Sequence, residues 1–236
     1  MNHKVLITGA NRGIGLALVR EYLSRGDFVA AACRHPDKAA ELSQLRPAHP
    51  DRFAILRLDV NSDQSVQADA GEVAEHFDGL DVLVNNAGVF GGKPATLADI
   101  RVLDFRDTYE TNVIGTFRVT RACLPILKRG RNARVVNVSS EAGMISRPLA
   151  EPRYYAYGAS KAALNYITRA LAKDLLADGI SVVALSPGWV RTDMGGPEAP
   201  LSVEESARGI VKVVHGLTIR DAGRWFRHDG SENEMW

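Results

Sequence analysis

Cysteine is scarce in this chain. The two cysteines, Cys33 and Cys123, are too few for a disulfide framework, and no cysteine–histidine spacing resembles a metal site. No apolar run is long enough to span a bilayer, and the four residues before the first apolar run leave no room for a signal peptide. The formal net charge is only +1, which gives no reason to expect a nucleic-acid surface. We therefore expect a soluble protein of the reducing cytoplasm, without nucleic-acid or membrane partners.

Short apolar runs alternate with helix-forming segments along the sequence. The runs typical of buried parallel strands cover residues 5–8, 28–33, 53–58, 80–84, 135–138, 180–185 and 224–227. Helices are expected from Leu16 onward and over 36–45, 62–77, about 105–128, about 157–177 and, after a capping box at Ser202 and Glu205, to about 215. This alternation predicts an α/β fold: one domain over residues 1–236, with a doubly wound parallel sheet of about seven strands and helices on both faces. Function is expected at the carboxyl ends of the strands.

A glycine-rich loop follows the first strand. Gly9, Gly13 and Gly15 have the spacing G-x-x-x-G-x-G and lead into an apolar helix. Phosphate binding at a helix start needs free backbone N–H groups and no side chains in the way. Glycines also form ordinary tight turns, but their position after the first strand of an α/β chain favours a nucleotide site.

The end of the second strand indicates which nucleotide. An NAD site places a carboxylate about twenty residues beyond the glycine loop. Here that place holds Cys33 and Arg34, and Arg12 lies inside the loop itself. Two guanidinium groups suit a 2′-phosphate, which predicts NADP(H). The alternative is that both arginines are ordinary surface residues.

Polar residues mark the ends of two later strands. Asn85 and Asn86 follow the fourth strand, Ser139 and Ser140 follow the fifth, and Asn112 lies in a long helical region. Asparagine can tie backbone segments together around a cofactor, and a serine hydroxyl can steady a substrate oxygen. Each also has a local explanation, as a turn, a polar helix position or a strand end.

Tyr157 is the clearest candidate for acid–base chemistry. Of the six tyrosines, only this one is followed four residues later by a lysine, Lys161. On a helix the two positions share a face. A phenol has a pKa of about 10, and a neighbouring ammonium lowers that pKa, which would permit proton exchange with a substrate oxygen. Such a pair also arises by chance, so the other motifs decide its meaning.

Together these motifs resemble the short-chain dehydrogenase/reductase family. The matching residues, in order, are Thr8-Gly-x-x-x-Gly-x-Gly15, Asn85-Asn-Ala-Gly88, Asn112, Ser140, Tyr157-x-x-x-Lys161 and Pro187-Gly-Trp-Val-Arg-Thr192. The chain is most similar to the carbonyl-reductase group that is related to sniffer and to bacterial C-factor. The resemblance implies a Rossmann-type fold and an NADP-dependent oxidoreductase.

The resemblance also implies roles for the catalytic residues. Tyr157 would protonate the carbonyl oxygen as hydride arrives, or accept the proton in reverse. Lys161 would lower the pKa of the phenol and bind the nicotinamide ribose. Ser140 would hydrogen-bond the substrate oxygen, and Asn112 would hold a water that links Lys161 to solvent.

A larger set would bind the cofactor. Asp59 would contact the adenine, Asn85 the region of its ribose, and Thr192 the carboxamide. The full predicted set is Gly9, Asn11, Arg12, Gly13, Ile14, Gly15, Arg34, Asp59, Val60, Asn85, Ala87, Gly88, Tyr157, Lys161, Pro187, Gly188, Val190 and Thr192.

The chain departs from the family between Ser140 and Tyr157, where it is longer than usual. The extra residues, 146–153, are expected to form a loop at the substrate mouth, and residues 188–201 a mobile flap. We expect either an apolar pocket from Met144, Ile145, Leu149, Tyr154, Trp189 and Met194 or a mixed core-and-surface role for some of them. Helix faces around Cys123 and residues 164–171 would form a homodimer or homotetramer.

Two functions from different classes remain open. The first is an NADPH-dependent carbonyl reductase acting on a small-molecule aldehyde, ketone or quinone. The second is an NADP(H)-binding signalling or sensor protein of the C-factor type. The presence of both Tyr157 and Lys161 favours the enzyme, because a sensor can dispense with them.

Overall fold

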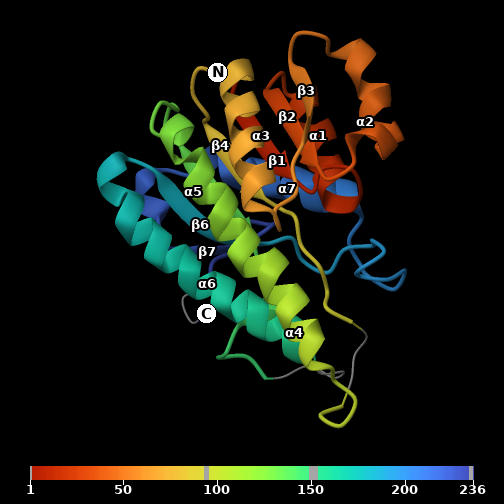
Figure 1. The fold of residues 1–236 in the computed structure, drawn as a ribbon. Coiled ribbons are helices and arrows are strands. Elements are labelled where there is room, and N and C mark those ends of the chain that lie inside the picture. Colours follow the sequence, from red (N-terminus) through yellow and green to blue (C-terminus); the bar gives the residue numbers. More distant parts are fainter. Residues whose placement is uncertain (1, 93–95, 149–153, 234–235) are drawn as a thin grey trace.

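The computed structural model describes residues 2–92, 96–148, 154–233 and 236 (Figure 1). Within these residues one sheet of seven parallel strands has the order β3-β2-β1-β4-β5-β6-β7. The strands are β1 (Lys4–Thr8), β2 (Phe28–Cys33), β3 (Phe53–Arg57), β4 (Val82–Asn85), β5 (Arg134–Val138), β6 (Ser181–Ser186) and β7 (Trp225–Arg227). The predicted α/β fold and its seven strands are confirmed, with boundaries that differ by at most two residues.

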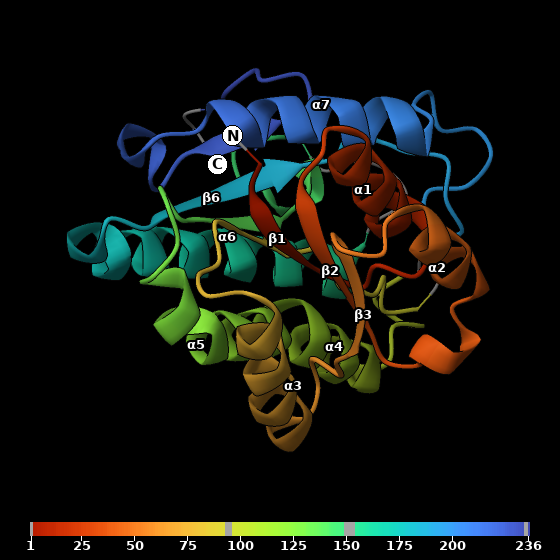
Figure 2. The ribbon, with the colours of Figure 1, turned by 90° about the horizontal axis from the view of Figure 1, so that it is seen from above.

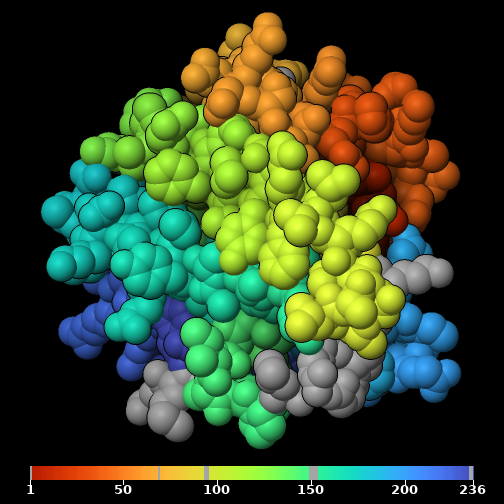
Figure 3. Space-filling view, turned by 60° about the horizontal axis from the view of Figure 1, so that its bottom comes forward, coloured from red at the N-terminus to blue at the C-terminus, as the bar shows by residue number. Residues whose placement is uncertain are grey.

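Helices cover both faces of the sheet (Figure 2). One layer consists of α1 (Gly13–Ser24), α2 (Ala40–Leu45) and α7 (Val203–Gly216). The other consists of α3 (Asp63–His76), α4 (Val102–Tyr109), α5 (Thr116–Leu127) and α6 (Tyr155–Leu175), and Figure 3 shows α4, α5 and α6 of this layer from outside. The capping box predicted at the start of α7 is present.

Two predicted helices are interrupted. A 3₁₀ turn, Pro36–Lys38, precedes α2 in place of the continuous helix expected over 36–45, because Ala39 leaves the helical backbone conformation. The long helical region expected over 105–128 contains a π-helical turn, Glu110–Gly115, between α4 and α5. That turn contains Asn112, one of the predicted site residues.

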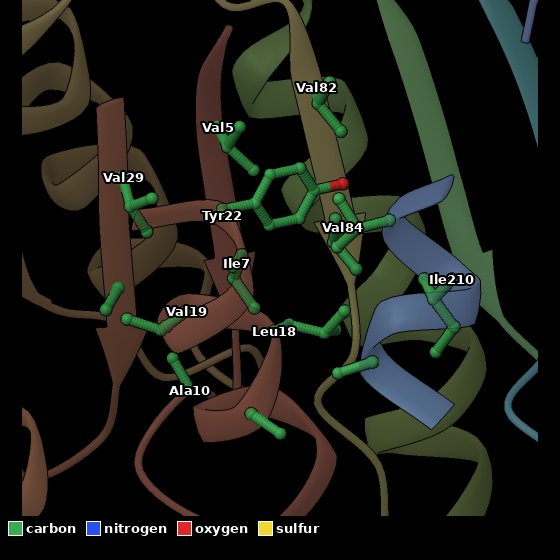
Figure 4. Packing of buried hydrophobic residues seen from close by; sticks show 14 of the residues in the cluster. Val5, Ile7, Ala10, Leu18, Val19, Tyr22, Val29, Val82, Val84 and Ile210 are labelled. Atoms are coloured by element: carbon green, nitrogen blue, oxygen red, sulfur yellow. The ribbon is translucent and has the colours of Figure 1, made fainter. Parts of the chain in front are cut away.

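The core consists of two apolar layers, one on each side of the sheet. Because side chains alternate along a strand, Val5 and Ile7 of β1 pack against α1 and α7, whereas Leu6 packs on the opposite face. Figure 4 shows the first layer, in which the ring of Tyr22 from α1 lies between the strands and α7. Burial on both faces explains the nearly continuous apolar runs of the strands.

All seven strands end at the same edge of the sheet because they are parallel. The loops that follow β1 to β6 therefore gather there, and these loops hold most of the predicted site residues. Among the residues described, no helix is both long and apolar enough to pass through a bilayer.

Candidate active site

The glycine loop between β1 and α1 has the backbone that phosphate binding requires. Gly9 and Gly13 have φ values of 63° and 54°. A Cβ on Gly15 would lie 2.3 Å from the carbonyl oxygen of Gly9, so the loop folds tightly onto the helix start. No side chain caps α1, and no acidic residue lies in its first turn. The first N–H groups of α1, including those near Ile14, can therefore meet a phosphate.

The loop is held against the end of β4 by Asn86. The hydroxyl of Thr8 accepts hydrogen bonds from the backbone N–H groups of Asn86 (3.1 Å) and Ala87 (3.0 Å). The Asn86 amide donates to the carbonyl oxygens of Thr8 (2.9 Å) and Gly9 (3.1 Å). Asn86 was absent from the predicted site set, although two asparagines directly after a strand were the signal for such a tie.

The side chain of Asn85 lies on the face of the sheet that α5 and α6 cover. Its amide nitrogen donates to Thr120 of α5 (3.0 Å) and to Asn137 of β5 (2.9 Å), and Asn137 donates to Thr168 of α6 (2.9 Å). This buried network joins β4 and β5 to two helices. Any contact of Asn85 with a cofactor would thus involve its backbone, because its side chain is used in packing.

The two arginines of the predicted 2′-phosphate site lie in the glycine loop and directly after β2. The backbone N–H of Ala10 donates to the carbonyl oxygen of Ala32 (3.1 Å), which places the glycine loop beside the end of β2, where Arg34 is exposed. Arg12 forms an ion pair with Asp193 (2.6 Å), in which both side chains are largely exposed. Both guanidinium groups can therefore reach solvent beside the loop.

Asp59 and Val60 follow β3 at the same edge. Asp59 accepts a hydrogen bond from the backbone N–H of Asn61 (3.1 Å). The side chain of Val60 is buried in the core against Gly115. The backbone of Val60, rather than its side chain, is therefore what this position offers to a ligand.

Ser140 and Tyr157 meet in front of β5. Ser140 accepts a hydrogen bond from the N–H of Ala142 (3.1 Å), which caps the 3₁₀ turn Glu141–Gly143, and its side chain also hydrogen-bonds Tyr157. On α6, Lys161 is buried and donates to the carbonyl oxygen of Val138 at 2.7 Å. Its Nζ lies 5.7 Å from the centre of the Tyr157 ring. The predicted serine, tyrosine and lysine thus come together.

The pKa of Tyr157 differs from the sequence-based expectation. Burial raises the pKa of the phenol, and the hydrogen bond from Ser140 only partly opposes that rise. Burial also lowers the pKa of Lys161 to about 8. The expected fall of the Tyr157 pKa next to Lys161 was therefore wrong for this structure: desolvation prevails, and the ammonium donates to a backbone carbonyl.

Asn112 joins the loop after β4 to α6. Its Oδ1 accepts from the N–H of Val89 (2.8 Å), and its Nδ2 donates to the carbonyl oxygen of Val89 (2.9 Å) and to Ser160 (3.0 Å). A Cβ on Gly88 would lie 3.3 Å from the Asn112 Oδ1 and 3.8 Å from the Lys161 Nζ. Asn112 and Lys161 therefore both lie close to Gly88. The predicted water relay between them stays a prediction.

Asn165 was not predicted from the sequence. It lies one turn beyond Lys161 on α6, where its Oδ1 accepts from Ser139 (2.5 Å) and its Nδ2 donates to the carbonyl oxygen of Gly143 (3.4 Å). It thus holds both ends of the segment that contains Ser140. The sequence signal was its i, i+4 spacing from Lys161.

A small pocket opens beside Tyr157. It is lined by Phe90, Gly91, Gly92, Ile100, Tyr154, Tyr155, Ala156 and Tyr157. The ring of Phe90 lies 4.8 Å, centre to centre, from the rings of both Tyr154 and Tyr157. Phe90 was missed because nothing in its local sequence distinguishes a pocket wall from an ordinary loop residue.

Of the six residues predicted for an apolar pocket, only Tyr154 lines this one. Met144 packs into the core with Ala184 and Trp225. The side chains of Ile145, Trp189 and Met194 are exposed, and Leu149 lies outside the described residues. Proximity in sequence was a poor guide here because the segments turn away from each other after their strands.

Residues 188–201, which we call the substrate loop, follow Pro187 at the end of β6. Arg191 donates to the carbonyl oxygens of Ala199 (2.9 Å) and Pro200 (2.8 Å), and Val190 pairs with Leu201. A Cβ on Gly13 would lie 3.5 Å from the Thr192 Cγ2. The substrate loop thus reaches back to the glycine loop and places Gly188, Val190 and Thr192 at the site edge.

The sequence profile of the short chain dehydrogenase family matches residues 3–200. The chain belongs to the short-chain dehydrogenase family. The NADPH-bound carbonyl reductase from chicken fatty liver is 36% identical, with a TM-score of 0.93 over 100% of this chain and 99% of that one. The carbonyl reductase Sniffer of Drosophila melanogaster is 35% identical, with a TM-score of 0.92 over 98% and 99%.

One relative of this short-chain dehydrogenase is named as a signal and not as an enzyme. The C-signal protein of Myxococcus xanthus is 43% identical over 153 residues, which are 65% of this chain and 91% of that protein. An oxidoreductase of Schizosaccharomyces pombe is 34% identical over 98% of this chain and 97% of its own length. The family, the fold and the neighbouring structures together identify the chain as an oxidoreductase of this family, which uses NAD(P).

Proposed function

We propose that the protein reduces the carbonyl group of an aldehyde, ketone or quinone to an alcohol, with NADPH as the hydride donor. The observation that carries the proposal is the contact of Ser140 with the half-buried phenol of Tyr157, backed by Lys161. Related carbonyl reductases have been solved with NADPH or NADP bound. We extend these properties to this chain as part of the proposal.

The residues fit an NADP dinucleotide. The open N-terminus of α1 would hold the pyrophosphate, and Arg12 and Arg34 would hold the 2′-phosphate. The two residues that directly follow β2, Arg34 and His35, include no carboxylate that would repel this phosphate, and the first acid, Asp37, lies in the 3₁₀ turn beyond them. Asp59, Val60, Ala87, Pro187 and Thr192 lie at the same edge and would complete the binding site.

The chain's own residues would then manage the proton. When bound, NADPH would supply the hydride for the carbonyl carbon. Ser140 and Tyr157 would hold the carbonyl oxygen between two hydroxyl groups, and Tyr157 would donate its proton as negative charge develops there. The raised pKa of Tyr157 keeps the phenol protonated at neutral pH, so the acid needed for reduction is present. An alkoxide is a stronger base than a phenolate, which makes the transfer favourable.

Lys161 would stabilise the phenolate that remains after this transfer. With a pKa of about 8, it is mostly an ammonium at neutral pH. The Phe90 side of the pocket would exclude water from the reacting atoms.

The test is Tyr157→Phe, with Tyr166→Phe as the control on an exposed position of the same helix. Tyr157→Phe should bind NADPH with unchanged affinity in a fluorescence titration and lose at least about 10²-fold in kcat. Tyr166→Phe should retain wild-type kcat. Turnover that survives in Tyr157→Phe would refute the mechanism.

The identity with the C-signal protein favours a second candidate function, an NADP(H)-binding signalling protein in which turnover is secondary. The same variant separates the two. A deletion phenotype rescued equally by Tyr157→Phe and by the wild type would favour the sensor. Rescue by the wild type alone would favour the enzyme.

We also propose a cytoplasmic homodimer or homotetramer. Cys123 and Leu164 are themselves buried, whereas Tyr166, within the predicted 164–171 segment, is 75% exposed, so the outward faces of these helices would meet a partner subunit. The outer face of the same layer exposes Ile114 (45%) and Phe117 (40%), which gives a partner an apolar surface. Both thiols are free and buried, which suits a reducing compartment.

A further inference from the structure

We infer that Arg147 and Arg227 form an anion-binding rim at the substrate mouth, which selects carbonyl substrates that carry a carboxylate. This inference rests on the proposed carbonyl reduction and names the substrate class. It starts from Glu141, the residue directly after Ser140.

Glu141 binds two arginines from different parts of the chain. Its Oε1 accepts from the Arg227 Nη2 at 2.7 Å, and its Oε2 accepts from the Arg147 Nη1. Arg147 belongs to the longer segment between Ser140 and Tyr157 that distinguishes this sequence. The carboxylate beside the proposed catalytic serine is therefore shared by two cations.

The position of Arg227 places this group at the site edge. Arg227 ends β7 and pairs in register with Ser186, the residue before Pro187. A Cβ on Gly188 would lie 3.0 Å from the His228 Nδ1, so the end of β7 adjoins the start of the substrate loop. The ion pair with Glu141 thus crosses the carboxyl end of β6, between the serine turn and the substrate loop.

Two guanidinium groups share the Glu141 carboxylate. Among the described residues, no second carboxylate forms an ion pair with Arg147 or Arg227. Asp229 accepts a hydrogen bond from Ser231 while its charge also acts on Arg227, and Glu232 pairs with Arg224. The side chains of Arg147 and Arg227 are 44% and 40% exposed. Each keeps N–H groups that face solvent, and Glu141 fixes their position in advance.

A carboxylate on the substrate can use these free N–H groups in a bidentate contact. The aromatic pocket of Phe90 and Tyr154 borders Tyr157 and suits an apolar or aromatic body. An aldehyde or ketone with an aromatic body and an anionic group matches both surfaces. A neutral analogue of the same shape matches only one.

The experiment compares para-carboxybenzaldehyde with its methyl ester, which differ in charge but hardly in shape. The measured quantity is the kcat/KM for the carboxylate divided by the kcat/KM for the methyl ester, with NADPH as the hydride donor. We expect a wild-type ratio well above one and a fall of about tenfold in the ratio for the double variant Arg147→Gln/Arg227→Gln, because the variant removes the charge-assisted contact with the substrate carboxylate.

Two further variants sharpen the test. Glu141→Gln removes the compensating charge and should raise the ratio, the opposite direction to the arginine variants. Arg20→Gln is the matched control, because Arg20 is similarly exposed (46%) and paired with Glu41 on the distant α1–α2 side. It should leave the ratio unchanged, and high salt should lower the wild-type ratio.

A wild-type ratio near one, or equal losses for both substrates in the arginine variants, would overturn the inference and leave Glu141 as a tie between a loop and β7. A binding measurement separates this from failure of the proposed function. Calorimetry on the enzyme with NADP⁺ compares para-(hydroxymethyl)benzoate with its methyl ester. If the carboxylate binds preferentially, and this preference depends on the arginines, but neither aldehyde is turned over, the rim is supported and the carbonyl reduction is rejected. If the aldehydes are turned over but the carboxylate is not preferred, the carbonyl reduction is supported and the rim is rejected.

Discussion

Gly143 lies directly against the backbone of Lys161. A Cβ on Gly143 would be 2.5 Å from the carbonyl carbon of Lys161 and 2.7 Å from the amide nitrogen of Ala162. Gly143 ends the 3₁₀ turn that Ser140 caps. The turn can therefore dock onto α6 beside the Tyr157–Lys161 pair only because residue 143 has no side chain.

Gly143→Ala should consequently damage both stability and activity. The added methyl group meets backbone, which cannot rotate away, so we expect a loss of about 1–3 kcal/mol in urea unfolding. A displaced Ser140 should also lower kcat with NADPH.

Gly71→Ala is the control for this prediction. Gly71 lies within α3, and no heavy atom lies within 4 Å of a Cβ placed there. That substitution should stabilise the protein by about 0.5–1 kcal/mol through helix propensity. Equal stabilities of Gly143→Ala and the wild type would show that the turn is not seated as described.

Lys161→Met should make the protein more stable and inactive. Burial lowers the pKa of Lys161 from 10.5 to about 8, and each pKa unit corresponds to about 1.4 kcal/mol, so keeping the buried ammonium costs the folded state about 3 kcal/mol at pH 7. The variant leaves the carbonyl oxygen of Val138 without its donor, which returns about 1 kcal/mol of that gain. A net increase of about 1–2 kcal/mol in the unfolding free energy is expected.

The pH dependence of this gain identifies its origin. The folded-state pKa of Lys161 lies below the unfolded value, so the penalty is complete below about pH 8 and disappears as the pH rises towards 10.5. The advantage of Lys161→Met should shrink over that window. A variant that is less stable than the wild type at pH 7 would mean that the lysine contributes more by its hydrogen bond than it costs by burial.

The sequence predicted the sheet, and which candidate residues lie at its carboxyl edge, far better than it predicted their contacts. Strand positions followed from apolar runs such as 28–33, and the candidate residues followed from motifs at the strand ends. Parallel strands bring those ends together whatever the intervening helices contain. This is why Gly9, Ser140 and Tyr157, which are far apart in the chain, could be assigned to one edge.

Side-chain partners could not be predicted, because they depend on which face of an element a residue occupies and on burial. Asn85 and Asn86 are adjacent, yet one packs under the sheet and the other ties down the glycine loop. Burial also reversed the expected direction of the Tyr157 pKa. The spacing of Tyr157 and Lys161 predicts that the two side chains are close, but it does not predict that burial removes water from around them.

Arg34→Asp should change which cofactor binds. Arg34 is exposed at the end of β2 beside the glycine loop, so the substitution should leave the melting temperature nearly unchanged. We expect NADPH affinity to fall by about tenfold or more, since a charged contact with the 2′-phosphate is replaced by repulsion. NADH affinity should change little. Fluorescence titrations of both nucleotides measure the ratio, and equal effects on the two would contradict the 2′-phosphate assignment.

Acid should destabilise the protein through a buried cluster at the opposite edge of the sheet. Asp27 is 2% exposed there, accepts a hydrogen bond from the backbone N–H of His3 (2.7 Å), and lies 3.3 Å from His215 at the end of α7. Tyr22, Arg134 and Asp81 also act on this cluster. Burial favours the neutral acid at Asp27, but contacts with His215 and His3 outweigh it and lower its pKa.

The direction of the effect follows from two lowered pKa values. Burial, with the charges of His215 and Arg134, lowers the pKa of His3 below 6.5, so the unfolded chain takes up a proton before the folded one as the pH falls through 6.5. Asp27 adds a second loss as the pH falls through 3.8 and below, because its folded pKa also lies beneath the unfolded value. Unfolding free energy measured in urea should therefore decline in two stages between pH 7 and pH 3.

Asp27→Asn should separate the stages. The amide still accepts from the His3 N–H but lacks the negative charge that lies 3.3 Å from His215, so the variant should lose about 1–2 kcal/mol at pH 6 and show a flatter decline below pH 4. The loss near pH 6.5 should persist in Asp27→Asn, because it belongs to the histidine. Stability that stays constant from pH 7 to pH 5 in the wild type would show that His3 is protonated equally in the folded and unfolded chains.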